Sequence, residues 1–261
     1  MNKPFFKVKI LATIFTACLL IASCSDDDNN NPLNQSISKE DVQKNLDLEK
    51  ASAFVDNLIM DQSSDLVTPG RSGKNSNECI DVAFADGSYA ITFTDCNIDG
   101  NTINGKINVS YTIADQAITS SISFEGFTFN DSSIEGNKTT EYSANFTDLT
   151  FMYSVTSDLA INIPNVITGT IKGTKKFEIS GGLTENTIII TGNWDVTING
   201  ESYSLVIDPS LRGTSVCGYI VEGVLTITEN GSSASIDYGD GICDNIATVT
   251  YPDGTSEEIE L

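Results

Sequence analysis

Three oxygen-bearing side chains with the spacing of calcium ligands stand close together in the chain: Asp95, Asn97 and Asp99, followed by Gly100. Calcium prefers carboxylate and amide oxygens at alternate positions of a loop, with a glycine where the loop turns sharply. The twelfth position of such a loop is Lys106, where a bidentate glutamate is expected. An Asx-rich turn between strands is the competing interpretation. The three residues are therefore a calcium candidate with half a ligand set, and the sequence predicts no other metal and no cofactor.

Histidine is absent from all 261 residues. This absence excludes Ser-His-Asp and Cys-His catalysis and every histidine-ligated metal site. The Gly-rich segment 100–107 has Ile107 where a phosphate-binding loop needs Ser or Thr, and a strand pattern follows it instead of a helix. Paired carboxylates could run glycoside hydrolysis, but 36 acidic residues single out no particular pair. We therefore expect a protein that is not an enzyme, with a carboxylate-based hydrolase as the least favoured alternative.

Cys24 is the cysteine with the clearest chemistry. It follows a short basic segment and an apolar run over residues 10–21, the form of a secretory signal. Ile21-Ala22-Ser23-Cys24 resembles the lipobox of bacterial lipoproteins, in which the thiol receives a diacylglyceryl group and the signal peptide is cut just before it. The resemblance implies that residues 1–23 are a signal peptide and that a lipid on Cys24 anchors the mature protein to a membrane.

The acidic run after this cysteine, Ser25-Asp26-Asp27-Asp28, is similar to the export signal of surface-exposed lipoproteins of Bacteroidota. In that family it implies transport to the outer membrane and display on its extracellular side. The competing interpretation is a solvated acidic linker. On either interpretation residues 24–37 form a flexible acidic and Asn-rich tether behind the acylated cysteine.

The charge balance limits the possible partners. The chain has 14 basic and 36 acidic residues, a net charge of −22; removal of residues 1–23 takes away three lysines and no acid, which gives −25. Such a negative field disfavours nucleic acids and anionic lipid surfaces. We therefore expect contact with the membrane through the lipid alone, and no nucleic-acid partner.

A single helix is predicted at residues 38–64. Ser38-Lys39-Glu40-Asp41 has the spacing of a capping box, in which the hydroxyl caps the first turn and the acid reaches back. Five apolar residues then recur at helical spacing on one side: Leu48, Ala51, Val55, Leu58 and Ile59. This amphipathic helix should pack on the rest of the protein, and residues 65–77, rich in Ser, Gly and Asn, should form a connecting loop.

Residues 78–261 change to an alternating pattern typical of strands, rich in Thr, Ser, Ile and Val. Pairs that favour hairpin turns recur in this region: Asp86-Gly87, Asn104-Gly105, Asn199-Gly200, Asn230-Gly231 and Asp253-Gly254. No helical segment separates the strands, which excludes parallel βαβ units. The expected fold class is all-β, with a large antiparallel meander of about twelve strands curled into a sandwich, a barrel or a rolled sheet.

Four cysteines remain in the predicted β domain, and an exported chain tends to oxidise them. A two-residue loop at Gly87-Ser88 would place Cys79 opposite Cys96. A loop at Asn230-Gly231 would place Leu225 opposite Ile236, and a bulge at Gly239 or Gly241 would bring Cys217 to Cys243. These registers favour two local disulfides, Cys79–Cys96 and Cys217–Cys243. Both regions also resemble the cysteine-containing β-rich repeats of uncharacterised Bacteroidota lipoproteins, which carry no known activity.

Three functions stay open at this point. The first is a binding or structural accessory module for a glycan or another surface protein. Four aromatic residues could form a sugar-stacking platform, although burial in the core is the usual place for an aromatic in an alternating strand: Trp194, Tyr142, Tyr153 and Tyr203. The second is a curled sheet that carries a lipid or other apolar ligand. An exposed aromatic strip would favour the binder, an apolar cavity the carrier, and two close buried carboxylates the hydrolase.

Overall fold

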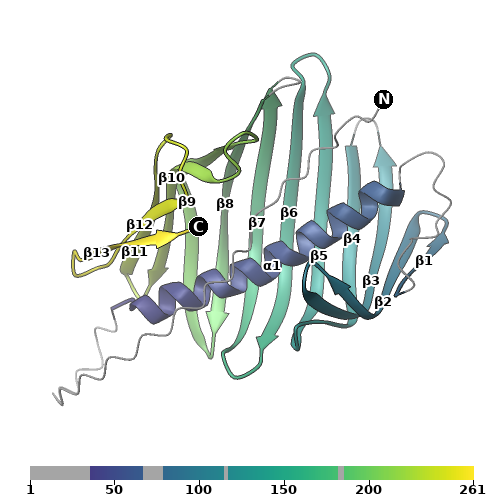
Figure 1. Ribbon diagram of the computed structural model, residues 1–261, viewed down its shortest axis with the longest axis horizontal. Coiled ribbons are helices and arrows are strands. Elements are labelled where there is room, and N and C mark those ends of the chain that lie inside the picture. Colours follow the sequence, from purple (N-terminus) through teal and green to yellow (C-terminus); the bar gives the residue numbers. More distant parts are fainter. Residues whose placement is uncertain (1–35, 67–78, 115–116, 182–184) are drawn as a thin grey trace.

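The computed structural model describes residues 36–66, 79–114, 117–181 and 185–261 as one helix and thirteen strands (Figure 1). The helix α1 covers Lys39–Leu66. The strands are β1 Ile80–Ala85, β2 Ser88–Ile98, β3 Asn101–Ala114, β4 Ala117–Phe129, β5 Ser132–Asn145, β6 Thr150–Ile163, β7 Ile167–Gly181, β8 Asn186–Ile198, β9 Glu201–Thr214, β10 Ile220–Glu229, β11 Ser232–Asp240, β12 Ile246–Thr250 and β13 Ser256–Glu260. The signal peptide, the lipobox, the tether up to residue 35 and nearly all of the predicted loop 65–77 lie outside the described residues.

The thirteen strands form one antiparallel sheet in which every strand pairs with its neighbour in sequence. The all-β meander predicted from the sequence is therefore confirmed. Of the three closures left open, the structure has a single sheet that does not close into a barrel, and β1 and β13 are its edge strands.

Four of the five turn dipeptides lie between strands, and their backbone conformation explains why. Asn199 and Asn230 adopt positive φ angles of 53° and 48° between the strands they join, a conformation that Asn tolerates. Asn104-Gly105 is the exception, because it lies inside β3. A Cβ on Gly105 would stand 2.1 Å from the carbonyl oxygen of Gly126, so glycine serves there for the close approach of β4, beside a register shift.

The helix begins at the predicted capping box. The backbone N–H of Asp41 donates to Ser38 Oγ at 3.2 Å, and the backbone N–H of Ser38 donates to Asp41 Oδ2 at 2.9 Å. The five apolar residues predicted to share one side of the helix are all buried. Their burial against the sheet, more than intrinsic propensity, stabilises a helix of this composition.

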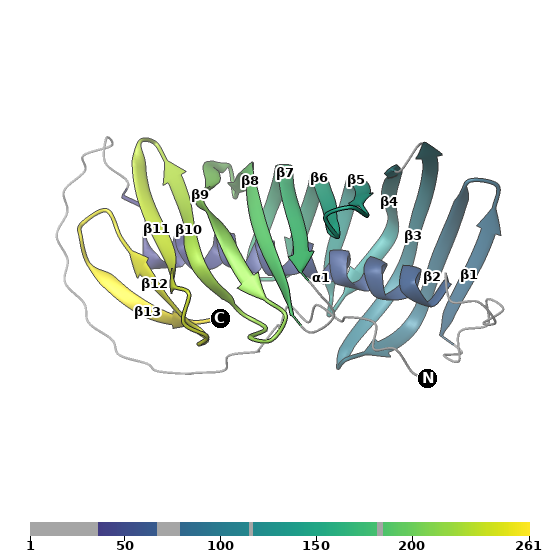
Figure 2. The same cartoon turned by 90° about the horizontal axis from the view of Figure 1, so that it is seen from above.

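Helix α1 lies against one face of the sheet and runs across the strands, as the two views show (Figures 1 and 2). At its start, Lys39 Nζ bonds Glu257 Oε2 on β13. Near its middle, Leu48 contacts β7, where a Cβ on Gly169 would stand 2.7 Å from Leu48 Cδ1. Farther along, the ring of Phe54 stacks on that of Phe129 of β4, with centroids 4.7 Å apart. We call the face that α1 covers the helix-side face and the opposite one the outer face.

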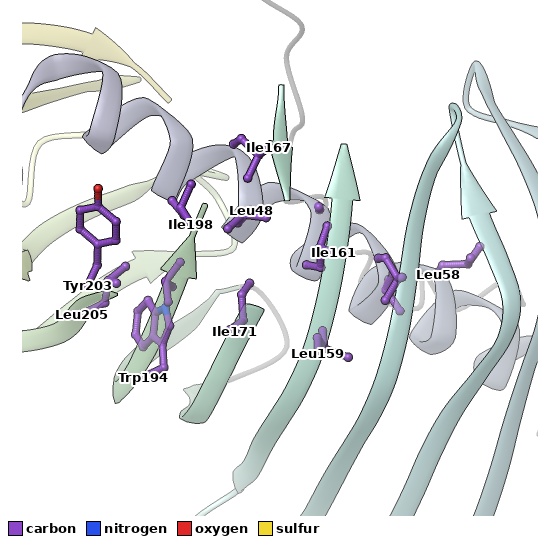
Figure 3. Close-up of a cluster of buried hydrophobic side chains, with 14 of the residues drawn as sticks. Leu48, Leu58, Leu159, Ile161, Ile167, Ile171, Trp194, Ile198, Tyr203 and Leu205 are labelled. Carbon is purple, nitrogen blue, oxygen red and sulfur yellow. The ribbon is translucent and has the colours of Figure 1, made fainter. Parts of the chain in front are cut away.

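The hydrophobic core lies between α1 and the helix-side face (Figure 3). Alternate residues of each strand point to this face, so β6 contributes Leu159 and Ile161 while the residues between them stay exposed. Trp194 and Tyr203 belong to this core, with 4% and 2% of their surface exposed.

The disulfide Cys79–Cys96 is present, with Cα atoms 5.3 Å apart, but the register predicted for its hairpin is wrong. The loop is Asp86-Gly87, and Val82 pairs with Ile91, whereas the predicted loop at Gly87-Ser88 would have paired Val82 with Phe93. The backbone N–H of Thr94 donates to the carbonyl oxygen of Cys79, so Cys79 lies two residues short of Cys96 in the ladder. Between the pairs Phe93–Gly105 and Cys96–Ile103, β2 advances by three residues and β3 by two; this one-residue bulge contains Asp95, whose φ is 48°, and the disulfide closes beside it.

The disulfide Cys217–Cys243 is also present, with Cα atoms 5.6 Å apart, and here the predicted register is confirmed. Leu225 pairs with Ile236 around the Asn230-Gly231 turn. Between the pairs Val224–Asp237 and Glu222–Asp240, β10 advances by two residues and β11 by three. The extra residue forms a bulge at Tyr238-Gly239, one of the two predicted places, but because it lies on β11 it moves the register of Cys217 away from Cys243 and not toward it. The disulfide joins the turn before β10 to the segment between β11 and β12.

Candidate functional site

The helix leaves part of the helix-side face uncovered at β1–β3, and an aromatic row stands there. Phe84 pairs across the strands with Tyr89, and Tyr111 lies diagonally next to Tyr89 on β3. The ring centroids are 6.2 Å apart for Phe84 and Tyr89 and 6.4 Å apart for Tyr89 and Tyr111. Phe84 is 60% exposed and Tyr111 is 37% exposed, so the row presents its rings to solvent.

A second aromatic group continues on the same face toward the centre of the sheet. Tyr142, Tyr153 and Phe177 stand side by side in register on β5, β6 and β7. The two tyrosine rings stack with centroids 4.5 Å apart, and Phe177 follows at 5.4 Å. Burial raises the pKa of Tyr142 and of Tyr153 above the ordinary value, so both hydroxyls stay neutral hydrogen-bonding groups at physiological pH.

Two exposed isoleucines connect the two aromatic groups. Ile113 of β3 pairs with Ile118 of β4, and Ile118 pairs with Tyr142. We define the aromatic strip by these eight residues, none of which carries a charge: Phe84, Tyr89, Tyr111, Ile113, Ile118, Tyr142, Tyr153 and Phe177. Contiguous exposed apolar surface on a folded domain is typical of an interaction site. The strip is therefore the candidate functional site.

A buried lysine fastens the helix beside the strip. The Nζ of Lys138 donates to Asp56 Oδ1 at 2.6 Å, to Ser52 Oγ at 3.0 Å and to the Ser52 carbonyl oxygen at 3.3 Å. Burial lowers the pKa of Lys138, and the negative charge of Asp56 opposes this shift. A serine next to a lysine is one arrangement used for nucleophilic catalysis. Here the ammonium group of Lys138 donates to three acceptors and is covered by the helix. We therefore assign Lys138 a structural role, which is to hold α1 on the sheet.

A second ion pair crosses the same interface. Lys175 of β7 bonds Glu49 of α1, and its Nζ lies 4.3 Å from the centroid of the Trp194 ring. This cation–π contact uses the face of Trp194, and the core covers the ring. Trp194 and Tyr203, two of the four residues considered for a sugar platform, are thus core residues, whereas Tyr142 and Tyr153 belong to the strip.

Carboxylates gather near the start of the helix. Glu229 of β10 is 5% exposed, and its pKa is raised by burial and by the charges of Glu201 and Asp41. The hydroxyl of Tyr203 donates to Glu201 Oε2 at 3.1 Å. Two carboxylates with different surroundings are what a glycosidase needs. The start of α1 lies over this group, so a polysaccharide has no path to Glu229 while the helix is in place.

The calcium candidates are explained by the backbone. Asp95 and Asp99 adopt positive φ angles of 48° and 50°, one in the bulge of β2 and the other in the turn before β3. The backbone N–H of Asp95 donates to Asn104 Oδ1 at 2.7 Å, and Asn97 is exposed on β2. Within the ranges that the structure describes, no group of three His, Cys, Asp or Glu side chains is placed to hold a metal ion.

Comparison with known protein families, with curated proteins and with solved structures finds no match to the chain. In the described part of the chain, no helix has both the length and the apolar character needed to cross a membrane.

No pattern in the sequence pointed to Phe84, Tyr89 and Tyr111 as a group. Their direct pairing follows from the Asp86-Gly87 loop, since the Gly87-Ser88 loop would put Ile91 opposite Phe84, although both loops leave Phe84 and Tyr89 on one face. Alternation alone also cannot show which part of a sheet a helix leaves uncovered.

Proposed function

We propose that this protein is a lipoprotein anchored through Cys24, displayed on the extracellular side of an outer membrane, and that it binds a neutral glycan without catalysis. The proposed location rests on the lipobox and on Ser25-Asp26-Asp27-Asp28. The binding function rests on one observation, the solvent-exposed row of Phe84, Tyr89 and Tyr111 within an uncharged strip.

The chemistry of the row suits a sugar chain. The face of an aromatic ring carries partial negative charge and attracts the polarised C–H groups on the apolar face of a pyranose. Ring centroids 6.2 and 6.4 Å apart place successive rings at about the separation of neighbouring sugar units. The hydroxyl of Tyr111 adds a donor and an acceptor at the edge of the platform.

The charge of the protein selects among glycans. With a net charge of −25 after residue 23, the protein repels sulfated and uronic-acid polymers at low ionic strength. The strip offers no cation to compensate. Neutral polysaccharides are therefore the ligand class that the strip fits.

An apolar ligand is the second candidate, and Ile113 and Ile118 favour it, because they are 69% and 41% exposed and offer no hydrogen bond to a sugar. The carrier function needs the ligand to be shielded from water. The helix fills the middle of the helix-side face with its own side chains, which leaves the strip as an open surface.

The test uses the full-length protein in detergent and a panel of neutral and acidic polysaccharides, with fluorescent fatty acids as the apolar arm. The double variant Phe84→Ala, Tyr111→Ala should weaken binding to a neutral polysaccharide about tenfold, from the loss of two ring contacts. Phe146→Ala is the matched control, since this ring is 71% exposed outside the strip. Fatty-acid binding that depends on Ile113 and Ile118, with no glycan bound, would favour the carrier instead.

A further inference from the structure

The outer face of strands β1–β5 carries a hollow of about 390 Å³, directly behind the aromatic row. Two rows of cross-strand neighbours line it. One row is Ala83, Ala90, Asn108, Ser123 and Asn137, each paired with the next across the sheet. Every member is small and uncharged, and Asn and Ser both donate and accept hydrogen bonds.

The second row runs beside the first and is built in the same way. Ala85 pairs with Ser88, Ser88 with Ser110, and Ser110 with Ser121. Neighbouring strands lie about 4.7–4.9 Å apart, so the hydroxyls of this row repeat at that interval across the sheet. The hollow thus has a regular floor of polar groups, with alanines at the edge strand that leave room for close approach.

Several polar side chains of the hollow can still form hydrogen bonds with a ligand. Within the described chain, no side-chain hydrogen bond engages Ser110, Ser121 or Ser123. The same row behaves differently farther along, where Thr156 and Thr174 bond each other at 2.9 Å. The hollow is therefore a part of the outer face where hydroxyls are left for a ligand.

We infer that this hollow is a second carbohydrate site, one that takes an uncharged polyhydroxyl chain. None of the side chains that line the hollow is charged, although the protein has 36 acidic residues. The hollow therefore does not attract an ionic ligand, and a neutral ligand can bind there without removing water from a charged side chain of the protein. Hydroxyl and amide groups at a regular interval match a ligand whose own hydroxyls repeat along a chain. The ligand class rests on the proposed function, but the site lies on the opposite face, and of its lining residues only Phe84 and Tyr89 also belong to the strip.

The experiment titrates the full-length protein in detergent with neutral α-glucan and β-glucan oligosaccharides and measures the affinity and the number of binding sites by calorimetry. The double variant Ser110→Ala, Ser121→Ala removes two hydroxyls without adding bulk and should weaken binding at one of two sites about tenfold. The control is Thr156→Ala, Thr174→Ala, which removes two hydroxyls of the same row that bond each other. It should leave binding unchanged. Circular dichroism and thermal unfolding establish that each variant folds.

The outcomes separate the two proposals. Because Phe84 also lines the hollow, Tyr111→Ala alone is the strip variant here. Loss with the serine variant and retention with Tyr111→Ala would support the hollow and contradict the aromatic strip. Two binding sites, each lost with its own variant, would support both. Unchanged binding with the serine variant, equal loss with the threonine control, or no binding to any of the oligosaccharides would overturn the hollow as a site.

Discussion

Lys138 Nζ lies 2.6 Å from Asp56 Oδ1 and joins β5 to α1 across 82 residues of sequence. The lysine side chain is completely buried, whereas the aspartate is 24% exposed. Removal of one partner of such an ion pair destabilises the fold, because the remaining buried charge has neither a counter-charge nor water around it.

Asp56→Ala should therefore lower the free energy of unfolding by about 3 kcal/mol, since it strands the buried ammonium group. Lys138→Met should cost less, because it replaces the charge by an apolar chain of similar length and leaves a partly hydrated aspartate. Urea denaturation of both variants measures the difference. Lys172→Met is the control, because its pair with Asp158 at 2.9 Å is exposed and should contribute little. Equal losses of unfolding free energy in Lys138→Met and Lys172→Met would contradict a stabilising role for the Lys138–Asp56 pair.

Glu229 should make the protein less stable as the pH rises. Burial and the charges of Glu201 and Asp41 raise its pKa in the folded state, so the folded protein holds this proton more tightly than the unfolded chain. Stability is therefore lost as the pH rises through the unfolded and then the folded pKa of Glu229. Glu229→Gln should raise the melting temperature at pH 7.5 and leave it unchanged well below the ordinary glutamate range. Thermal unfolding at the two pH values checks this, and a variant that is destabilised at pH 7.5 would contradict the sign.

Each disulfide should stabilise the fold through the loop it closes. The sequence separations are 17 residues for Cys79–Cys96 and 26 for Cys217–Cys243. The chain-entropy estimate for such loops is about 3 kcal/mol each. The paired variants Cys79→Ser, Cys96→Ser and Cys217→Ser, Cys243→Ser should each lose about this much in denaturant titrations. Peptide mapping without reduction should give only the two local cross-links, and a peptide joining Cys79 to Cys217 or Cys243 would refute them.

Cys24→Ala should abolish lipid attachment. Ile21-Ala22-Ser23 precedes the cysteine and the apolar run ends there, so no other thiol is placed to receive the lipid. The variant should accumulate as uncleaved precursor or leave the membrane fraction. Metabolic labelling with a palmitate analogue and fractionation measure this, with Cys18→Ala as the matched control. Normal maturation of the Cys24 variant would disprove the anchor.

Replacement of Asp26, Asp27 and Asp28 by alanine should keep the protein inside the cell envelope. The acidic run is the feature that resembles the surface-export signal. Intact cells treated with added protease should then spare the variant and digest the natural protein. If substitution of the three Asn residues 29–31 protects equally well, or if the aspartate variant is still digested, the run is a plain linker.

The fold could be predicted from the sequence because most local signals agreed with the sheet. The alternation of Ile, Val and Thr fixed the strands, and Asn199-Gly200 and Asn230-Gly231 fixed their turns. Asn104-Gly105 misled the turn assignment because glycine was required there for a contact with Gly126, which is a tertiary property. The error in the predicted loop, Gly87-Ser88 in place of Asp86-Gly87, has a similar origin. The bulge at Asp95 cannot be recognised from the alternation of apolar and polar residues.

The candidate site was only half predictable. The sequence offers Tyr142 and Tyr153 together with Trp194 and Tyr203, and nothing in their sequence neighbourhoods separates the half-buried pair from the fully buried pair. The difference arises from the path of α1, which packs against the strand segments around Trp194 and Tyr203 (Figure 3), whereas Tyr111 is 37% exposed. That path depends on the contacts of Lys39, Leu48 and Phe54 with three strands that are distant in sequence.

The meander and the crossing helix also set an order of folding. Each strand finds its partner next in sequence, so the sheet can grow hairpin by hairpin with short loop closures and little entropy lost at any step. The helix has no such local partner, because its contacts reach from β4 to β13. Although α1 is the first element of the fold to be synthesised, it can dock only after most of the sheet has formed. Its arrival closes the core and buries Lys138, so the step that completes the fold is also the one that hides its only fully buried charge among the described residues.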